Sequence, residues 1–224
     1  DTGSPGVTYF YRLCAVDKAR NVSSGATASA KAVPELTKPS GTVAINQGPL
    51  TNKAAVTLNL AASDASKVAA YCISNTDTCP AWTTLATPVT PLSIPAKPWT
   101  LAAGIDGDRH VNVWFRDIWG NVSDPANTST TLDTTKPTGT ITIDEGATTT
   151  STVINLTLSA TDTGNGVDSM RFSKDKITWL PWVGYATSSS CILSSAKGQK
   201  TVYVQFNDKA GNVSPIYSAT ITLQ

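Results

Sequence analysis

The chain has 224 residues, of which 40% are hydrophobic, and its formal net charge is +1. This length suits about two domains of roughly 100 residues each, and the hydrophobic content argues against a chain that is disordered throughout. The near-neutral charge gives no reason to expect nucleic acid or an anionic membrane surface as a partner. No apolar run approaches the ~20 residues that a membrane span needs.

The cysteine content bears on the compartment of the protein, and the first residue bears on how the chain was produced. Four cysteines in so polar a chain favour an exported protein. The chain begins at Asp1, with neither an initiator methionine nor a signal peptide. We therefore expect a processed or excised piece of a larger protein.

The first predicted element is a hairpin within residues 1–33. Tyr9, Tyr11 and Leu13 alternate with other residues, which is typical of a strand with one buried face. The Asp and Asn side chains of residues 17–23 suit a tight turn after this strand. Two strands alone are marginally stable in water, so we expect something outside this segment to cover the three apolar side chains.

A linker follows, and with it a sequence repeat begins. Residues 33–39 contain two prolines, which cannot donate to a sheet ladder, so we interpret them as a linker between domains. Residues 37–45 are echoed 98 positions later by residues 135–143. The apolar alternation of the next strand repeats with the same offset.

The ends of the two repeated units match as well. The turn at residues 117–123 recurs 91 positions later at residues 208–214, so the units differ in length in their middle loops, where length varies at little cost. Two complete homologous domains are therefore predicted, at residues 38–133 and 136–224. Their short alternating runs, frequent turn signals and lack of helical periodicity predict antiparallel sandwiches.

Two parts of the sequence resemble known families. Residues 9–17 resemble the sixth strand of a fibronectin type III domain, in which a Tyr-x-Tyr-x-aliphatic-x-Ala run faces the core. The whole chain resembles tandem bacterial immunoglobulin-like and fibronectin type III-like repeats of large exported proteins, because residues 133–137 look like the start of such a repeat and residues 206–212 like its end. The resemblance implies an all-β chain of tandem immunoglobulin-like antiparallel β-sandwiches in an extended rod. It also implies an extracellular location or the bacterial cell surface.

Cys72 and Cys79 flank a mostly polar loop of six residues. A disulfide that closes so short a loop would stabilise the domain by about 2–2.5 kcal/mol on the chain-entropy model. A metal site is the alternative, but no other Cys or His lies nearby in sequence, so we predict the disulfide. The matching loop of the last domain, residues 172–176, lacks both cysteines, so the bridge is not essential to the fold.

The other two cysteines have no assigned partner. Cys14 alternates with Leu13 and Ala15, so it points away from its own core, and its natural partner would lie in the part of the first domain that this chain lacks. Cys191 falls near the position that Trp99 holds in the preceding domain, which suggests ordinary burial.

Acidic residues of the last domain are candidate calcium ligands. Asp162, Asp168 and Asp208 would converge if loops gathered at one end of a sandwich, and calcium takes six to eight oxygen ligands. Asp64 and Asp117 recur at matching places in the preceding domain, which fits turn capping equally well. We expect no cofactor apart from this calcium alternative.

Aromatic and histidine side chains are the remaining candidates for a site. Trp114 alternates outward and Trp119 sits in a hairpin turn. Such rings either stack on sugars or anchor a protein partner, or they pack against a neighbouring domain or loop, which we favour. His110 neighbours an inward valine and is expected at the surface, and nothing in the sequence supplies the oriented base that Ser or Cys catalysis needs.

The leading interpretation is a non-enzymatic spacer, stalk or adhesion segment of a bacterial surface or secreted protein. Its partners would be other domains of the same protein or neighbouring subunits. The first alternative is an accessory module that binds a glycan or a protein.

The second alternative is a subunit of an extracellular fibre. Residues 7–33 expose an unpaired strand edge and an apolar face, with Tyr9, Tyr11, Leu13 and Cys14 as candidate contacts. Either the rest of that domain lies outside the chain, which we favour, or the hairpin completes a sheet in a neighbouring subunit by strand addition.

Overall fold

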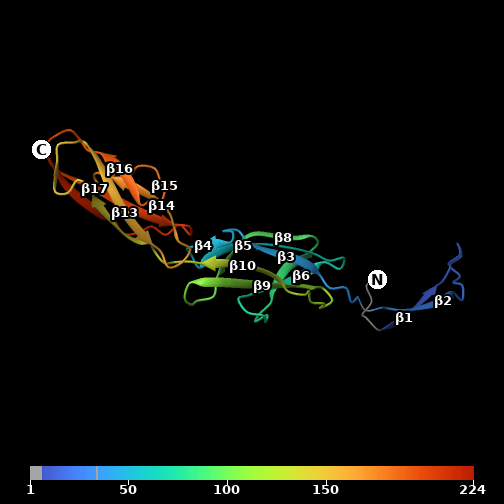
Figure 1. Ribbon diagram of the computed structural model, residues 1–224. Coiled ribbons are helices and arrows are strands. Elements are labelled where there is room, and N and C mark those ends of the chain that lie inside the picture. Colours follow the sequence, from blue (N-terminus) through green and yellow to red (C-terminus); the bar gives the residue numbers. More distant parts are fainter. Residues whose placement is uncertain (1–6, 34) are drawn as a thin grey trace.

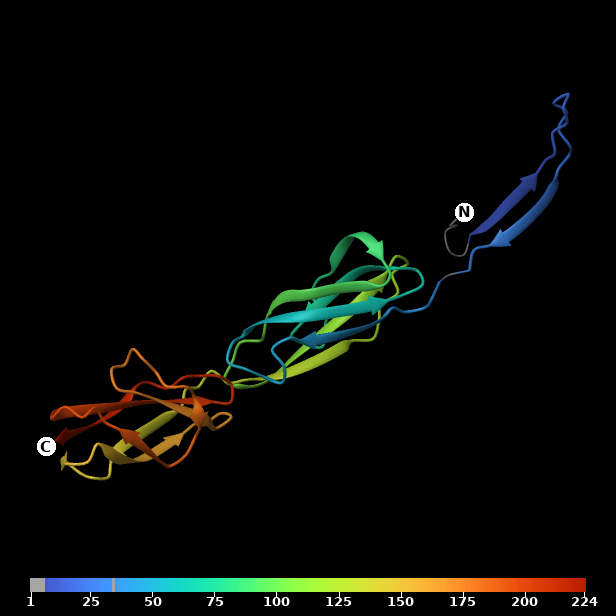
Figure 2. The same ribbon diagram turned by 90° about the horizontal axis from the view of Figure 1, so that it is seen from above.

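The computed structural model describes residues 7–33 and 35–224. The first six residues of the expected hairpin unit and residue 34 of the expected linker lie outside the described residues. All regular elements of the described part are strands, which confirms the predicted all-β class. Figures 1 and 2 show a lone hairpin followed by two sandwiches in a row.

The hairpin consists of β1 (Thr8–Leu13) and β2 (Ala26–Lys31). The first sandwich contains eight strands: β3 (Ser40–Ile45), β4 (Leu50–Thr51), β5 (Ala55–Ser63), β6 (Val68–Ser74), β7 (Thr83–Val89), β8 (Leu92–Thr100), β9 (Gly107–Asp117) and β10 (Ala126–Leu132). The second sandwich contains the eight matching strands: β11 (Thr138–Ile143), β12 (Thr148–Thr149), β13 (Val153–Thr161), β14 (Val167–Ser173), β15 (Val183–Gly184), β16 (Ser188–Ile192), β17 (Gly198–Asp208) and β18 (Tyr217–Leu223).

Both sandwiches have the same topology. A three-stranded sheet, in the order β3-β5-β8 or β11-β13-β16, packs on a five-stranded sheet, in the order β4-β10-β9-β6-β7 or β12-β18-β17-β14-β15. All the strand pairs within them are antiparallel except β4 with β10 and β12 with β18, which are parallel. The two units are therefore tandem immunoglobulin-like sandwiches, as the repeat predicted.

The period-2 apolar pattern places the cores. In the first sandwich Val111, Val113 and Phe115 of β9 are fully buried, and they face Val56, Leu58 and Leu60 of β5 within one hydrophobic cluster. In the second sandwich the same positions are filled by Val202, Val204 and Phe206 of β17 and by Ile154, Leu156 and Leu158 of β13. Alternation at these strands therefore predicted the buried face correctly.

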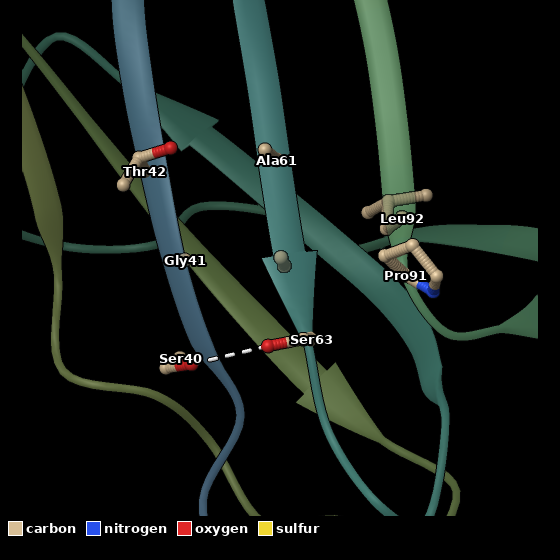
Figure 3. A pocket seen from close by; sticks show the side chains of 8 residues that line it. Ser40, Gly41, Thr42, Ala61, Ser63, Pro91 and Leu92 are labelled. Carbon is tan, nitrogen blue, oxygen red and sulfur yellow. Dashed lines mark hydrogen bonds between the residues drawn. The ribbon is translucent and has the colours of Figure 1, made fainter.

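A glycine at the start of each sandwich lets the opposing sheet come close. An ideal Cβ on Gly41 would lie 2.3 Å from Cε2 of Phe115, and one on Gly139 would lie 2.6 Å from Cε2 of Phe206 and 2.5 Å from the carbonyl oxygen of Ser159. Figure 3 shows Gly41 on β3 among the small residues that line a pocket of about 340 Å³. The aromatic ring of each core thus occupies the space that any larger residue would need.

Replacing Gly139 with alanine should destabilise the second sandwich. We expect a loss of about 1–3 kcal/mol in the free energy of unfolding, because the new methyl group overpacks against the Phe206 ring and the Ser159 carbonyl. Urea unfolding measures this. Gly184→Ala is the matched control, since no atom lies within 4 Å of a Cβ at that position. Equal stability of the two variants would contradict the role given to Gly139.

Candidate functional site

Three carboxylates meet at the junction between the two sandwiches. One carboxylate oxygen each from Asp133, Asp162 and Asp208 lies within 4.8 Å of the others. Asp133 follows β10, Asp162 follows β13, and Asp208 ends β17. Asp133 and Asp208 are each only 1% exposed, so two of the three carboxylates are almost wholly removed from water.

The junction before the first sandwich carries the same cluster. Glu35, Asp64 and Asp117 also place one carboxylate oxygen each within 4.8 Å of the others. Glu35 and Asp64 precede their counterparts by 98 residues and Asp117 precedes its counterpart by 91, the two offsets of the sequence repeat. At both junctions, therefore, three carboxylates cluster where the linker enters the sandwich.

The closing turn of each sandwich ties itself to the linker. The backbone N–H of Asn212 donates to Oδ1 of Asp208 at 2.8 Å, and its side-chain amide donates to Oδ2 of Asp208 at 2.8 Å and to the backbone carbonyl of Asp133 at 2.7 Å. In the first sandwich Asn121 donates in the same way to Asp117 and to the backbone carbonyl of Glu35. The turn-capping role considered for these aspartates is thus present in the structure.

In the second cluster, one carboxylate oxygen accepts no hydrogen bond from the described residues. Oδ2 of Asp162 accepts from the backbone N–H groups of Gly164 and Gly166 at 2.8 and 3.1 Å. Oδ1 of Asp162 is buried and has no hydrogen-bond partner among the described residues. A buried polar atom without a partner is costly, and here it lies beside two further carboxylates. Oxygen ligands of this kind suit calcium.

The set of candidate calcium ligands needs one correction. Asp162 and Asp208 lie together as expected, but Asp168 is exposed and is not a member of the cluster, because it lies within β14 rather than in a loop at the junction. The third member is Asp133. Gly164 allows this approach, since a Cβ there would lie 2.3 Å from Oδ2 of Asp133. The signal for Asp133 was its match to Glu35, an acidic residue ahead of each Thr-Lys-Pro.

Hydrogen bonds also lower the pKa of Glu35 in the first cluster. The Thr37 side chain donates to the carboxylate of Glu35 and thereby holds the pKa of Glu35 below its ordinary value. The lowered pKa means that Glu35 keeps its charge to lower pH than an ordinary glutamate does.

A disulfide joins Cys72 to Cys79, the pair expected from the sequence. In the second sandwich Arg171 occupies the position of Cys72, since Cys72 pairs with Trp114 on β9 and Arg171 with Gln205 on β17. The Arg171 guanidinium lies over two tryptophan rings, 4.8 Å from the centroid of Trp179 and 4.5 Å from that of Trp182. A covalent bond in one repeat and cation–π stacking in the other therefore hold the same loop.

The two tryptophans proposed as partner contacts differ in exposure. Trp114 points to the outer face of β9 but is only 8% exposed, and its cross-strand neighbour Cys72 is also buried. The alternative in which Trp114 is a partner contact is therefore wrong, and its burial agrees with the favoured interpretation, packing against neighbouring residues. Trp119 is 39% exposed in its turn. His110 is exposed on β9, as expected.

The hairpin displays apolar side chains to solvent. Leu13 is 80% exposed, Tyr11 is 46% exposed and Tyr9 is half-buried. Phe10, on the opposite face of the strand, is 82% exposed. Cys14 is a half-buried free thiol, as is Cys191 in the second sandwich. The described residues therefore leave most of this surface uncovered, and its role as a strand donor stays a prediction.

The chain is similar to several solved structures at low sequence identity. No protein-family model and no curated protein matches the chain. Among solved structures, the fibronectin(III)-like modules of Clostridium thermocellum CbhA align at 15% identity and a TM-score of 0.49, over 82% of this chain and 94% of theirs.

Two adhesins are also similar. A tetra-tandem repeat in the extending region of a large adhesion protein aligns at 17% identity and a TM-score of 0.30, over 97% of this chain and 56% of that one. A 1.5-MDa bacterial ice-binding adhesin aligns at 17% identity and a TM-score of 0.41, over 97% and 75%. The chain thus resembles tandem immunoglobulin-like and fibronectin type III-like modules, including those of bacterial adhesins. The described residues contain no helix able to cross a membrane.

The disulfide can be tested directly. A non-reduced digest analysed by mass spectrometry should contain a peptide linked through Cys72 and Cys79. Reduction should lower the free energy of unfolding of the first sandwich by about 2–2.5 kcal/mol, because the unfolded chain regains the freedom that the short loop removes. The second sandwich, held by Arg171 instead, serves as the internal control. Free thiols at both positions in protein prepared without reductant would refute the bond.

Proposed function

We propose that this chain is a non-enzymatic spacer segment of a bacterial surface or secreted protein. The observation that carries the proposal is the junction: the same turn, linker and carboxylate cluster join one unit to the next at both places. A repeated, hydrogen-bonded joint suits a chain whose task is to span distance. The only histidine, His110, is exposed on a strand, so a serine or cysteine nucleophile would need another base.

Hydrogen bonds from the second sandwich hold the last residue of the first sandwich. Asp133, the residue that ends the first sandwich, receives hydrogen bonds at Oδ2 from the backbone and side chain of Asn165, at 2.9 and 3.1 Å, and at its carbonyl oxygen from Asn212. Two loops of the second sandwich therefore hold the last residue of the first. Such a joint restricts the angle between neighbouring units.

A calcium ion would strengthen this joint. Asp133, Asp162 and Asp208 would hold it in the second junction, and Glu35, Asp64 and Asp117 in the first. The unpaired Oδ1 of Asp162 is the specific observation that favours it. Bound there, the ion would neutralise adjacent like charges and link the linker to two loops of the following sandwich.

Scattering and calorimetry test the joint. Small-angle scattering of the full chain should give an elongated particle, and a chelator should broaden its distribution of lengths. Calcium titration should show binding that Asp162→Asn weakens by about tenfold or more, since one charged ligand is lost.

Asp168→Asn is the matched control, because it removes an exposed acid of the same sandwich that lies on β14, outside the cluster. A compact particle would refute the spacer. Absent binding, or equal affinity of the two variants, would refute the calcium site while leaving the spacer standing.

The exposed hairpin favours a second candidate function, subunit assembly by strand addition. The free edge of β1 would pair with a strand of a neighbouring subunit, which would also cover the apolar side chains of β1, and repeated pairing would build a head-to-tail fibre. The glycan-binding alternative retains only Trp119 of its two tryptophans.

Deleting residues 1–33 separates assembly from spacing. The two sandwiches should remain folded, because their cores contain no residue of the hairpin, and they should be monomeric by light scattering at concentrations where the full chain polymerises. The full chain is the control. Polymers that persist without the hairpin would rule out strand addition through it.

A further inference from the structure

The two sandwiches differ at one core position of the three-stranded sheet. Trp99 of β8 pairs with Val56 of β5, and Cys191 of β16 pairs with Ile154 of β13. The next residues confirm the register: Leu101 donates its backbone N–H to Ala54, and Leu193 donates to Thr152 in the same way. Cys191 therefore stands where the preceding repeat has an indole ring.

Trp99 shows what this position holds in the first sandwich. Its ring packs against the hydrophobic core, and Nε1 donates to Oδ1 of Asn75 at 2.8 Å. The amide of Asn75 donates in turn to the backbone carbonyl of Thr100 at 3.0 Å. The indole thus fills the space between the core and the loop after β6, with its one polar atom satisfied.

The thiol of Cys191 leaves that space open in the second sandwich. A pocket of about 310 Å³ lies there, with Phe172, Leu180 and Cys191 as its apolar lining and Ser173, Lys174, Asp175 and Thr178 as its polar lining. Phe172 belongs to the core, so the pocket reaches the interior of the sandwich. Its size falls at the lower end of small-molecule pockets, which run from about 300 to 1,000 Å³.

The loop that borders the pocket is held in shape. Oδ1 of Asp175 accepts hydrogen bonds from the Ser173 hydroxyl and from the backbone N–H groups of Ile177 and Thr178, at 3.0, 2.8 and 2.7 Å. The backbone bonds lower the pKa of Asp175 to about 2. A carboxylate therefore lines the pocket, one residue beyond Lys174, which follows Ser173 as Asn75 follows the matching Ser74 in the first sandwich.

We propose that this pocket binds an indole-sized aromatic side chain of a protein partner. The shape is given by Trp99, which occupies the same position in the other repeat, and Asp175 offers the acceptor for the indole N–H. The rim is partly apolar: Leu180, which lines the pocket, is 60% exposed. A protein surface around the inserted ring would cover this rim, as anchor residues do in interfaces.

Titration of the full chain with N-acetyl-tryptophanamide tests the pocket. Methyl NMR signals of Leu180, which lines the pocket, should shift and saturate, and N-acetyl-alaninamide should not produce these shifts. The ligand should also slow the alkylation of Cys191, which lines the pocket, whereas Cys14, the other half-buried free thiol, should react at an unchanged rate. This second measurement needs no variant.

Two variants give a matched comparison. Cys191→Trp places the repeat's own indole in the pocket and should weaken ligand binding by about tenfold or more, while Cys191→Ser preserves the space and should bind as the original chain does. A short peptide with tryptophan between leucines should bind more tightly than N-acetyl-tryptophanamide, because it also covers the rim.

Each result decides part of the proposal. Shifts that do not saturate, equal shifts with N-acetyl-alaninamide, or equal alkylation with and without ligand would overturn the site. Tighter binding of N-acetyl-tryptophanamide than of the peptide would overturn the protein partner. None of these results depends on the spacer function.

Discussion

In each sandwich, the hydrogen bonds of one asparagine hold the closing turn against the linker. In each closing turn an Asn side chain joins the Asp that begins the turn to the backbone of the linker that enters the sandwich. Because these groups are removed from water in the second sandwich, where Asn212 is 8% exposed and Asp208 is 1% exposed, loss of one partner would leave the others unsatisfied. The turn therefore connects two strands of a sandwich and also binds the linker that leads into it.

The two sandwiches reach one topology with different local chemistry. A disulfide closes the loop after β6, whereas Arg171 stacks between two tryptophans beside the matching loop. An indole fills a core position in one unit and a thiol stands there in the other. What both units retain is the buried alternation of β5 and β9 and the glycine that faces the central phenylalanine. The fold therefore depends on those strands, and the loops are free to acquire separate roles.

The sequence predicted the strands because period-2 burial is a local property, and it predicted the repeat because the matching segments can be read directly, at offsets of 98 and 91 residues. It predicted the disulfide from a short separation. It failed where the answer depends on what covers a side chain or which loops meet. Alternation placed Trp114 on the outer face but could not show that this face is covered, and proximity in sequence suggested Asp168 where the fold brings Asp133. The Asp168 assignment failed because the cluster is formed by contacts between distant segments.

The short parallel pairs have a mechanical consequence. The backbone N–H of Asp133 donates to Thr51 at the end of the β4–β10 pair, and that of Gln224 donates to Thr149 at the end of the β12–β18 pair, each at 2.9 Å. In a parallel pair, tension that draws the two ends of a sandwich apart pulls the paired strands in opposite directions along their length. Their hydrogen bonds, which run between the strands, then carry the load together in shear. Force on such a chain would therefore load these hydrogen bonds at the last residues of each unit, and in the first unit they lie next to the acidic junction.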